Sequence, residues 1–311
     1  MKLNIVIPCY NEEEVLHETN RQLTELVDSM ISDGLLTVCD ILYVDDGSKD
    51  NTWNIIEELR VTSQYAHGLK LAHNVGHQNA LWAGLKYSSD NNCDAAVSID
   101  ADLQHDINKI RDMVLAYQQG FEIVYGIRND RATDSMFKKR TALLFYKLMQ
   151  KMGVDVIPNH ADFRLLGKNA LRALAEFPER NLFLRGLVRL LGFKETEVYF
   201  DCNDRYAGKS KYTLRKMFNF AIDGITSFSV RPLRIISVIG LVCLGVSIVE
   251  MIYIIVAYFN GNTIRGWSSL LFSVWFLGGL MLFSIGVVGE YLGKIYKEVK
   301  RRPRYIIEKQ I

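Results

Sequence analysis

Cysteine is scarce in this sequence of 311 residues, and charge of neither sign dominates. The five cysteines are scattered and none stands in a C-x-x-C pair, which disfavours a zinc site or a disulfide framework and suits a reducing compartment. The 37 basic and 35 acidic residues give a formal net charge of +2, whereas a generic nucleic-acid binder is usually far more basic. Hydrophobic residues make up 49%, which excludes a disordered chain and provides enough apolar material for a core.

Glycine-rich nucleotide motifs are also missing. No G-x-G-x-x-G follows the first apolar run, so a dinucleotide-binding fold is disfavoured. The tripeptide Gly208-Lys209-Ser210 looks like the tail of a phosphate-binding P-loop, but Asn203 stands where the first glycine should be. Because no apolar strand leads directly into this segment, we exclude an NTPase of that class.

Two long apolar runs stand near the C-terminus. Residues 235–259 carry no charge except Glu250, and residues 267–288 carry none. As helices, both runs are long enough to cross a hydrocarbon core of about 30 Å. Buried helices of a soluble domain are the alternative, but such helices rarely run so far without a polar face. We therefore expect a hairpin of two transmembrane helices.

The flanks of this hairpin are basic. Arg231 and Arg234 precede the first run and six cations follow the second over residues 294–304, whereas the link at 260–266 carries one cation. Under the positive-inside rule both flanks lie in the cytoplasm and the link faces out. The globular part and both termini are therefore expected to be cytoplasmic.

The first 130 residues alternate between short apolar runs and helical patterns. Strands are expected over 3–8, 40–44, 69–72, 95–99 and 122–125, and helices over 12–30, 52–59, 77–88 and 106–118. Such alternation predicts βαβ units, and so an α/β fold with a mostly parallel sheet. In these sheets ligands bind beyond the carboxyl ends of the strands.

Polar side chains follow four of the expected strands at the point where each ends. The segments are Pro8-Cys9-Tyr10-Asn11-Glu12-Glu13, Asp45-Asp46-Gly47-Ser48, Asp100-Ala101-Asp102-Leu103-Gln104 and Gly126-Ile127-Arg128. One such end would be explained as a helix cap, but four together indicate a shared site.

The residue types at these ends indicate the chemistry of that site. The mutual repulsion of Asp100 and Asp102 would be relieved by Mg²⁺ or Mn²⁺, hard cations that leave coordination positions for substrate phosphates. Carboxylates such as Asp45 and Asp46 can accept hydrogen bonds from a nucleoside base or a ribose.

The ordered motifs resemble a known family. V-I-P-C-Y-N-E-E, V-D-D-G-S-x-D-N-T and D-A-D-L-Q-H are similar to those of family 2 glycosyltransferases, which have the Rossmann-like GT-A fold. The most similar branch is the polyprenyl-phosphate glycosyltransferases, which include dolichol-phosphate mannose synthase and bactoprenol glucosyltransferases. The resemblance continues through residues 126–128, 162–164, 205–212 and both apolar runs, so it covers the whole chain.

The resemblance implies a metal-dependent, inverting transfer of one sugar from a nucleotide-sugar donor to a polyprenyl phosphate. UDP-glucose and undecaprenyl phosphate are our first expectations. UDP-GlcNAc or another UDP-sugar follows closely, GDP-mannose is less favoured, and a dolichyl acceptor stays open. The resemblance further implies an integral protein of the cell membrane that contacts the bilayer but not nucleic acid. It also implies a homo-oligomer, dimeric or tetrameric, formed through the membrane segment.

The resemblance also implies roles for individual residues. The nucleotide-sugar would be bound by Pro8, Tyr10, Asn11, Glu12, Asp45, Asp46, Asp100 and Ser210. Asp100, Asp102 and Gln104 would hold the metal and the donor diphosphate, since an amide carbonyl suits a hard cation. His105 is expected to be only a polar residue at the start of the next helix.

Asp162 would be the catalytic base in this family, but other roles stay open. A phosphate acceptor, with a second pKa near 6, is already largely ionised at cytoplasmic pH. Asp162 would then orient the sugar or the acceptor, or form a buried pair with Arg164.

A basic segment without acids spans residues 205–216. We expect Arg205 and Lys211 to close over the donor diphosphate and offset leaving-group charge, and Arg128 to bind the acceptor phosphate. Arg215 and Lys216 are expected to be solvated near the membrane.

Four regions follow from these expectations: a GT-A catalytic domain over 1–211, an amphipathic juxtamembrane helix over 212–234, two transmembrane helices over 235–290 and a basic cytoplasmic tail over 291–311. Two other functions remain open. A processive polysaccharide synthase would need more spans and a Q-x-x-R-W-like motif, which the sequence lacks. A non-catalytic membrane scaffold is disfavoured by the intact acidic and basic sets.

Overall fold

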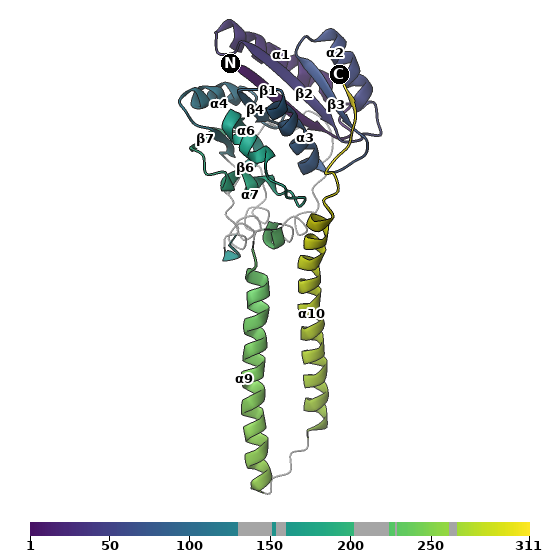
Figure 1. The fold of residues 1–311 in the computed structure, drawn as a ribbon, viewed down its shortest axis with the longest axis vertical. Coiled ribbons are helices and arrows are strands. Elements are labelled where there is room, and N and C mark those ends of the chain that lie inside the picture. The colour runs from purple at the N-terminus through teal and green to yellow at the C-terminus, as the bar shows by residue number, and fades with distance from the viewer. Residues whose placement is uncertain (130–150, 154–159, 202–223, 228, 261–265) are drawn as a thin grey trace.

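A computed structural model of the chain describes residues 1–129, 151–153, 160–201, 224–227, 229–260 and 266–311. Figure 1 shows an α/β domain from which two long helices, α9 (Arg231–Phe259) and α10 (Trp267–Lys300), extend in the same direction. Both chain termini lie at the domain end of the molecule (Figure 1).

The first part of the chain alternates strands and helices. The elements are β1 (Lys2–Cys9), α1 (Leu16–Ser32), β2 (Val38–Asp45), α2 (Thr52–Thr62), β3 (Ala66–Leu71), α3 (His77–Asp90), β4 (Ala95–Ser98), α4 (Lys109–Gln118) and β5 (Ile123–Arg128). All nine expected elements are confirmed, with shifted ends. α1 starts later than expected because the backbone N–H of Glu12 donates to Thr52 Oγ1 and that of Glu13 to Asp50 Oδ2, so these residues belong to a loop.

The strands form one eight-stranded sheet in the order β7-β5-β6-β4-β1-β2-β3-β8. The strands from β1 to β4 pair in parallel, which confirms the expected α/β sheet. The later strands were not predicted. β6 (His160–Gly167) lies antiparallel between β4 and β5, and β7 (Glu195–Phe200) extends the edge beyond β5.

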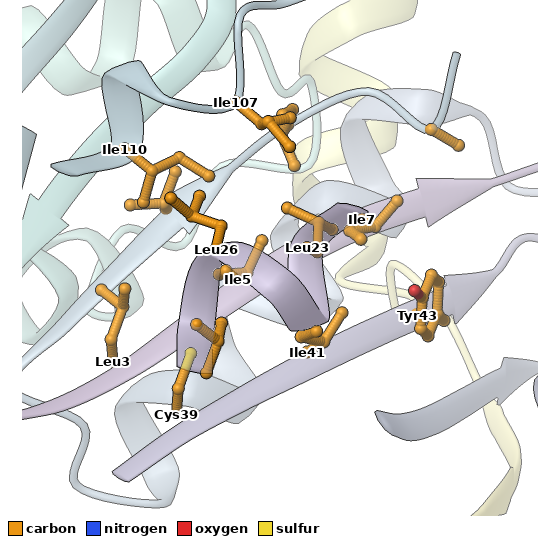
Figure 2. Close-up of a cluster of buried hydrophobic side chains, with 14 of the residues drawn as sticks. Leu3, Ile5, Ile7, Leu23, Leu26, Cys39, Ile41, Tyr43, Ile107 and Ile110 are labelled. Carbon is orange, nitrogen blue, oxygen red and sulfur yellow. The ribbon is translucent and has the colours of Figure 1, made fainter. Parts of the chain in front are cut away.

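The sheet is covered by a hydrophobic core on each face, as parallel sheets generally are. Alternate residues of β1 separate the two cores: Leu3, Ile5 and Ile7 pack with α1, α2 and α4, whereas Val6 packs with α3 on the other face. Figure 2 shows the first core, with the leucines of α1 facing side chains of β1 and β2. α6 (Lys168–Ala175) and α7 (Leu184–Leu190) complete the second core. The two cores leave the carboxyl edge of the sheet as the place for polar groups.

The end of the chain joins the sheet. After α10, β8 (Ile307–Gln310) pairs antiparallel with β3, and Ile311 exchanges backbone hydrogen bonds with Gly68. A Cβ on Gly68 would lie 2.8 Å from Ile311 Cγ1, so the glycine makes room for that side chain. From the sequence, residues 291–311 were expected to form one basic tail, and β8 was not predicted because its charged residues carry no strand signal.

Two long helices, α9 and α10, follow the α/β domain in the region where two transmembrane helices were expected. Phe276–Lys300 is the stretch, within the described residues, that is long and apolar enough to cross a membrane, with a mean hydropathy of 1.6 over its best 18 residues. α9 is 29 residues long and many of its described apolar side chains are exposed in the isolated chain.

Candidate active site

The loops after β1 and β2 are bound to each other at the carboxyl edge of the sheet. The backbone N–H of Asn11, which has a positive φ of 53°, donates to Ser48 Oγ at 3.0 Å. Asn11 Oδ1 in turn accepts the N–H of Lys49 at 2.9 Å. Neighbouring Pro8, Tyr10 and Glu12 are half-buried. The residues expected to hold the nucleoside are therefore brought together by these loops, and their binding role stays a prediction.

Asp45 and Asp46 follow β2 but differ in their partners. Both oxygens of Asp46 accept backbone N–H groups, from Val75 at 2.7 Å and Gly76 at 2.9 Å, so this carboxylate holds the loop between β3 and α3. Asp45 accepts one N–H from Ser48, while its Oδ2 is buried without a hydrogen-bond partner among the described residues. Burial raises the pKa of both carboxyls. Asp45 is thus the better placed of the two to accept a hydrogen bond from a ligand.

Gly47 lets these loops approach closely. It has φ +65°, and a Cβ there would lie 2.7 Å from Asn74 N. We predict that Gly47→Ala destabilises the protein by about 2–4 kcal/mol, from left-handed strain plus the clash. Gly34→Ala is the matched control, since Gly34 has φ +71° but open space around it. Thermal midpoints in detergent test this: equal losses for both variants would contradict the close approach.

The Asp100-x-Asp102 segment forms the bend after β4. Asp102 Oδ1 accepts the backbone N–H of Gln104 at 3.2 Å, and Leu103 between them has φ 56°. Asp100 and Asp102 are both partly exposed. The described residues contain no cluster of three His, Cys, Asp or Glu side chains that would hold a metal. Two accessible carboxylates fit a divalent cation that takes few protein oxygens and completes its shell with phosphates and water. Gln104 lies beside them, and its amide as a ligand stays a prediction.

His105 is part of the site rather than a helix-start residue. Its ring is 1% exposed, stacks on Phe163 at 5.2 Å and meets Phe200 edge-on at 5.4 Å between centroids. Its Nε2 lies 3.8 Å from Asp100 Oδ2. Burial lowers the pKa of His105, so the ring is neutral at pH 7. A neutral, clamped imidazole behind Asp100 restricts the positions that this carboxylate can adopt.

Asp162, on β6, is the centre of a buried charge cluster. Arg164, 1% exposed, donates to Asp162 Oδ1 at 2.5 Å, and Arg185 of α7 donates to both carboxylate oxygens at 3.2 Å. His77, at the start of α3, lies 3.6 Å from Asp162 and 3.8 Å from Asp100. The pair with Arg164 considered from the sequence is present, and it is extended by two residues that the sequence analysis missed.

The cluster sets the ionisation of its members. Burial alone would raise the pKa of Asp162. The neighbouring side chains of Arg185, His77 and Arg164 outweigh burial and hold that pKa well below its usual range. His77 is 43% exposed, and the carboxylates of Asp162 and Asp100 raise its pKa. A carboxylate stabilised as an anion in this way is a weak proton acceptor, which favours an orienting role for Asp162 over that of a base.

The cationic residues of the expected site are only partly described. Arg128 ends β5, its charge helps to lower the pKa of His105, and its Nε is buried without a hydrogen-bond partner among the described residues. Arg205, Ser210 and Lys211 lie outside the described residues, so their roles remain predictions.

His77 and Arg185 differ in how far the sequence could have revealed them. The strand-end rule applied to four strands holds equally for β3, whose end is followed by His73, Asn74 and His77. Arg185 has no such signal, because only packing of α7 against the sheet brings it to Asp162.

The chain is similar to known proteins over almost its full length. The model for "Glycosyl transferase family 2" matches residues 4–174. YkoT of Bacillus subtilis (strain 168), an uncharacterized glycosyltransferase, is 53% identical over 98% of this chain and 91% of its own length. The bactoprenol glucosyl transferase of Shigella phage SfII is 40% identical over 99% and 98%. The solved structure of S. aureus TarS 1-349 in complex with UDP is 15% identical, covers 73% of this chain and 65% of its own, and has a TM-score of 0.45.

The resemblance found in the ordered motifs is therefore confirmed. A family match over more than half of the residues agrees with relatives that align from end to end. The chain belongs to glycosyl transferase family 2.

Proposed function

We propose that this protein transfers glucose from UDP-glucose to a polyprenyl phosphate at the membrane, with inversion of the anomeric configuration. The observation that carries the proposal is the 40% identity, over 99% of this chain, to the bactoprenol glucosyl transferase of Shigella phage SfII. The charged groups gathered at the carboxyl edge of the sheet suit a reaction between two phosphorylated substrates.

The donor would bind between the first two loops and the aspartates after β4. Asp45, whose buried Oδ2 has no hydrogen-bond partner among the described residues, accepts a hydrogen bond from the base, while Asn11 and Ser48 fix the loop around the nucleoside. Asp100 and Asp102 would hold Mg²⁺ or Mn²⁺, and such a cation would offset negative charge on the donor diphosphate. His105 restrains Asp100 from behind.

The acceptor phosphate would attack the anomeric carbon from the opposite face. It arrives as an anion, so no proton has to be removed for attack. Arg128, whose Nε has no hydrogen-bond partner among the described residues, binds this phosphate. Asp162, held by two arginines, orients the sugar hydroxyls. A single displacement of this kind inverts the configuration.

The membrane part of the proposal rests on α9 and α10. We propose that both helices cross the bilayer as a hairpin, with the catalytic domain and both termini in the cytoplasm. In the isolated chain Val242, Tyr253, Met281 and Phe283 are all at least 60% exposed, which fits contact with lipid or with other copies of the chain. A dimer or tetramer formed through these helices would bury part of this surface.

Topology provides a prediction. Asn262→Cys should be labelled from outside intact cells by a membrane-impermeant maleimide, whereas Lys300→Cys should not, because the basic flanks stay inside. Labelling of position 300 but not 262 would place the catalytic domain on the wrong side for a cytoplasmic donor.

The basic segment provides another prediction. Arg205→Ala should lower kcat about tenfold to a hundredfold, more than it raises the donor KM, because a charge-assisted contact to the departing diphosphate strengthens in the transition state. Arg215→Ala, ten residues on, is the control and should weaken membrane association with little change in turnover. If the two variants behave alike, the segment is a general basic surface.

The proposed function is tested by a donor screen. Purified protein in detergent is given undecaprenyl phosphate and radiolabelled UDP-glucose, UDP-GlcNAc or GDP-mannose, and the lipid product is analysed. We expect single glucosyl transfer that EDTA abolishes and Mg²⁺ or Mn²⁺ restores. Polymeric product would support a processive synthase, and no transfer from any donor would support a scaffold.

A further inference from the structure

The segment from the end of α10 to the C-terminus returns to the α/β domain. Arg301 has a left-handed φ of 48°, which ends α10, and residues 307–310 then pair with β3 at the sheet edge. Figure 1 shows this return from α10 to the C-terminus beside β3. We call residues 298–311 the C-terminal strap.

An anionic side chain of the strap binds the loop between α6 and α7. The carboxylate of Glu298 accepts the backbone N–H of Arg180 at 2.7 and 2.8 Å and that of Asn181 at 2.8 Å. The side chain of Arg180 donates back to the carbonyl of Arg301 at 3.3 Å. Hydrogen bonds to an ionised acceptor are about twice as strong as neutral ones, so Glu298 fixes this part of the loop.

A cationic side chain of the strap, Arg304, binds the backbone carbonyl groups of the same loop. Arg304 donates from Nε to the carbonyl of Glu179 at 2.9 Å and from a terminal nitrogen to that of Phe177 at 2.5 Å. Its guanidinium also lies 4.0 Å from the ring centroid of buried Trp82 on α3. The strap thus joins the α6–α7 loop to α3 with contacts that only a planar guanidinium can make together.

The loop leads directly into the charge cluster of the site. The backbone N–H of Leu184 donates to Gln78 Oε1 at 3.0 Å, and its carbonyl accepts from Arg164 at 3.3 Å. The next residue, Arg185, donates to both oxygens of Asp162. Few residues therefore separate the backbone held by Glu298 from the arginine that holds Asp162.

We infer that Glu298 and Arg304 are positioning residues for the transfer reaction, which set Arg185 against Asp162 by holding the α6–α7 loop. Since Glu298 is in the last turn of α10, the end of the membrane-directed helix is thereby connected to the site. The catalytic consequence rests on the proposed function, whereas the structural connection does not.

The test measures the loop and the reaction separately, on full-length Glu298→Ala and Arg304→Ala proteins in detergent. Amide hydrogen exchange in peptides covering 177–190 should become at least about tenfold faster, since a lost charge-assisted bond shifts local opening by that factor. kcat for sugar transfer should fall about tenfold. The Kd for UDP should stay within about twofold, because separate hydrogen bonds hold the loops at Asn11 and Ser48.

The controls distinguish positioning from general destabilisation. Lys309→Ala removes an exposed strap contact to Glu57 and should change neither exchange at 177–190 nor kcat by more than about twofold. A Glu298→Ala, Arg185→Ala double variant should be no slower than Arg185→Ala alone, because Glu298 acts through Arg185. Arg304→Lys should recover only part of the loss, since it keeps the charge but not the planar fork.

The proposal fails if exchange at 177–190 is unchanged, if kcat stays normal, or if the losses in the double variant multiply. If Glu298→Ala does not fold, the same measurements are made on Glu298→Gln, which keeps an acceptor oxygen without the charge. An inactive wild-type protein would contradict the proposed function, and the exchange data would still decide whether the strap holds the loop.

Discussion

Asp102→Asn is expected to reduce sugar transfer by at least about a hundredfold while leaving the protein folded and in the membrane. The substitution keeps the shape of the side chain and its bond to the N–H of Gln104, but it removes one of two carboxylates that fit a divalent cation. Losing an anionic ligand raises the activation barrier by about 3 kcal/mol or more, which corresponds to a rate at least about a hundredfold lower. Initial rates at saturating Mg²⁺ or Mn²⁺ measure the effect.

The control for this substitution lies in the same loop. Asp106 Oδ1 accepts the backbone N–H of Asn108 at 3.0 Å and is not among the proposed ligands. Asp106→Asn should keep more than about a third of the activity, because it removes a negative charge near the proposed metal ligands without changing either of them. Retention of more than about a tenth of wild-type activity by Asp102→Asn, a barrier change below about 1.4 kcal/mol, would disprove the metal assignment.

Asp162→Ala is expected to have the largest effect on stability, about 3–5 kcal/mol, and to abolish transfer. Removing the carboxylate leaves the buried guanidinium of Arg164 without its counter-ion, and an uncompensated buried charge costs that much. Arg185 loses its contact with this carboxylate as well. Thermal inactivation in detergent measures the loss.

Two comparisons make this prediction specific. Arg21→Ala breaks an exposed pair with Glu18 and should cost far less stability than Asp162→Ala. Adding Arg185→Ala to Asp162→Ala should restore part of the stability, because it removes one of the two cations that repel each other once the carboxylate is gone. If Asp162→Ala were no worse than Arg21→Ala, the cluster would not be buried in solution.

The pH dependence separates the two roles considered for Asp162. Its pKa in the folded protein is below that in the unfolded chain, so its stabilisation is complete above about pH 4 and is lost only as pH falls through the lowered value. An acidic limb of the transfer rate near pH 6 would therefore not come from Asp162, whereas the acceptor phosphate does titrate near that pH. Asp162→Asn should lower the rate without moving that limb.

Much of the fold could be predicted because its signals are local. Short apolar runs alternating with helical patterns gave the strands from β1 to β5 and the helices between them. The ends of these strands gave Asp45, Asp100 and Asp102, because parallel strands deliver their carboxyl ends to one edge. β8 escaped prediction because its residues Ile307–Gln310 are exposed, two of the four are charged, and its pairing depends on β3, far away in the sequence.

The candidate site divides in the same way. The sequence by itself determined the family, the mostly parallel sheet and the acidic residues at its edge, since these depend on residue type and spacing along the chain. Only the tertiary structure decided which groups face each other: His105 behind Asp100, Arg185 on Asp162, and Glu298 on the loop before α7. These contacts join residues on separate elements, and their charges are held in place by burial and packing, which no local pattern records.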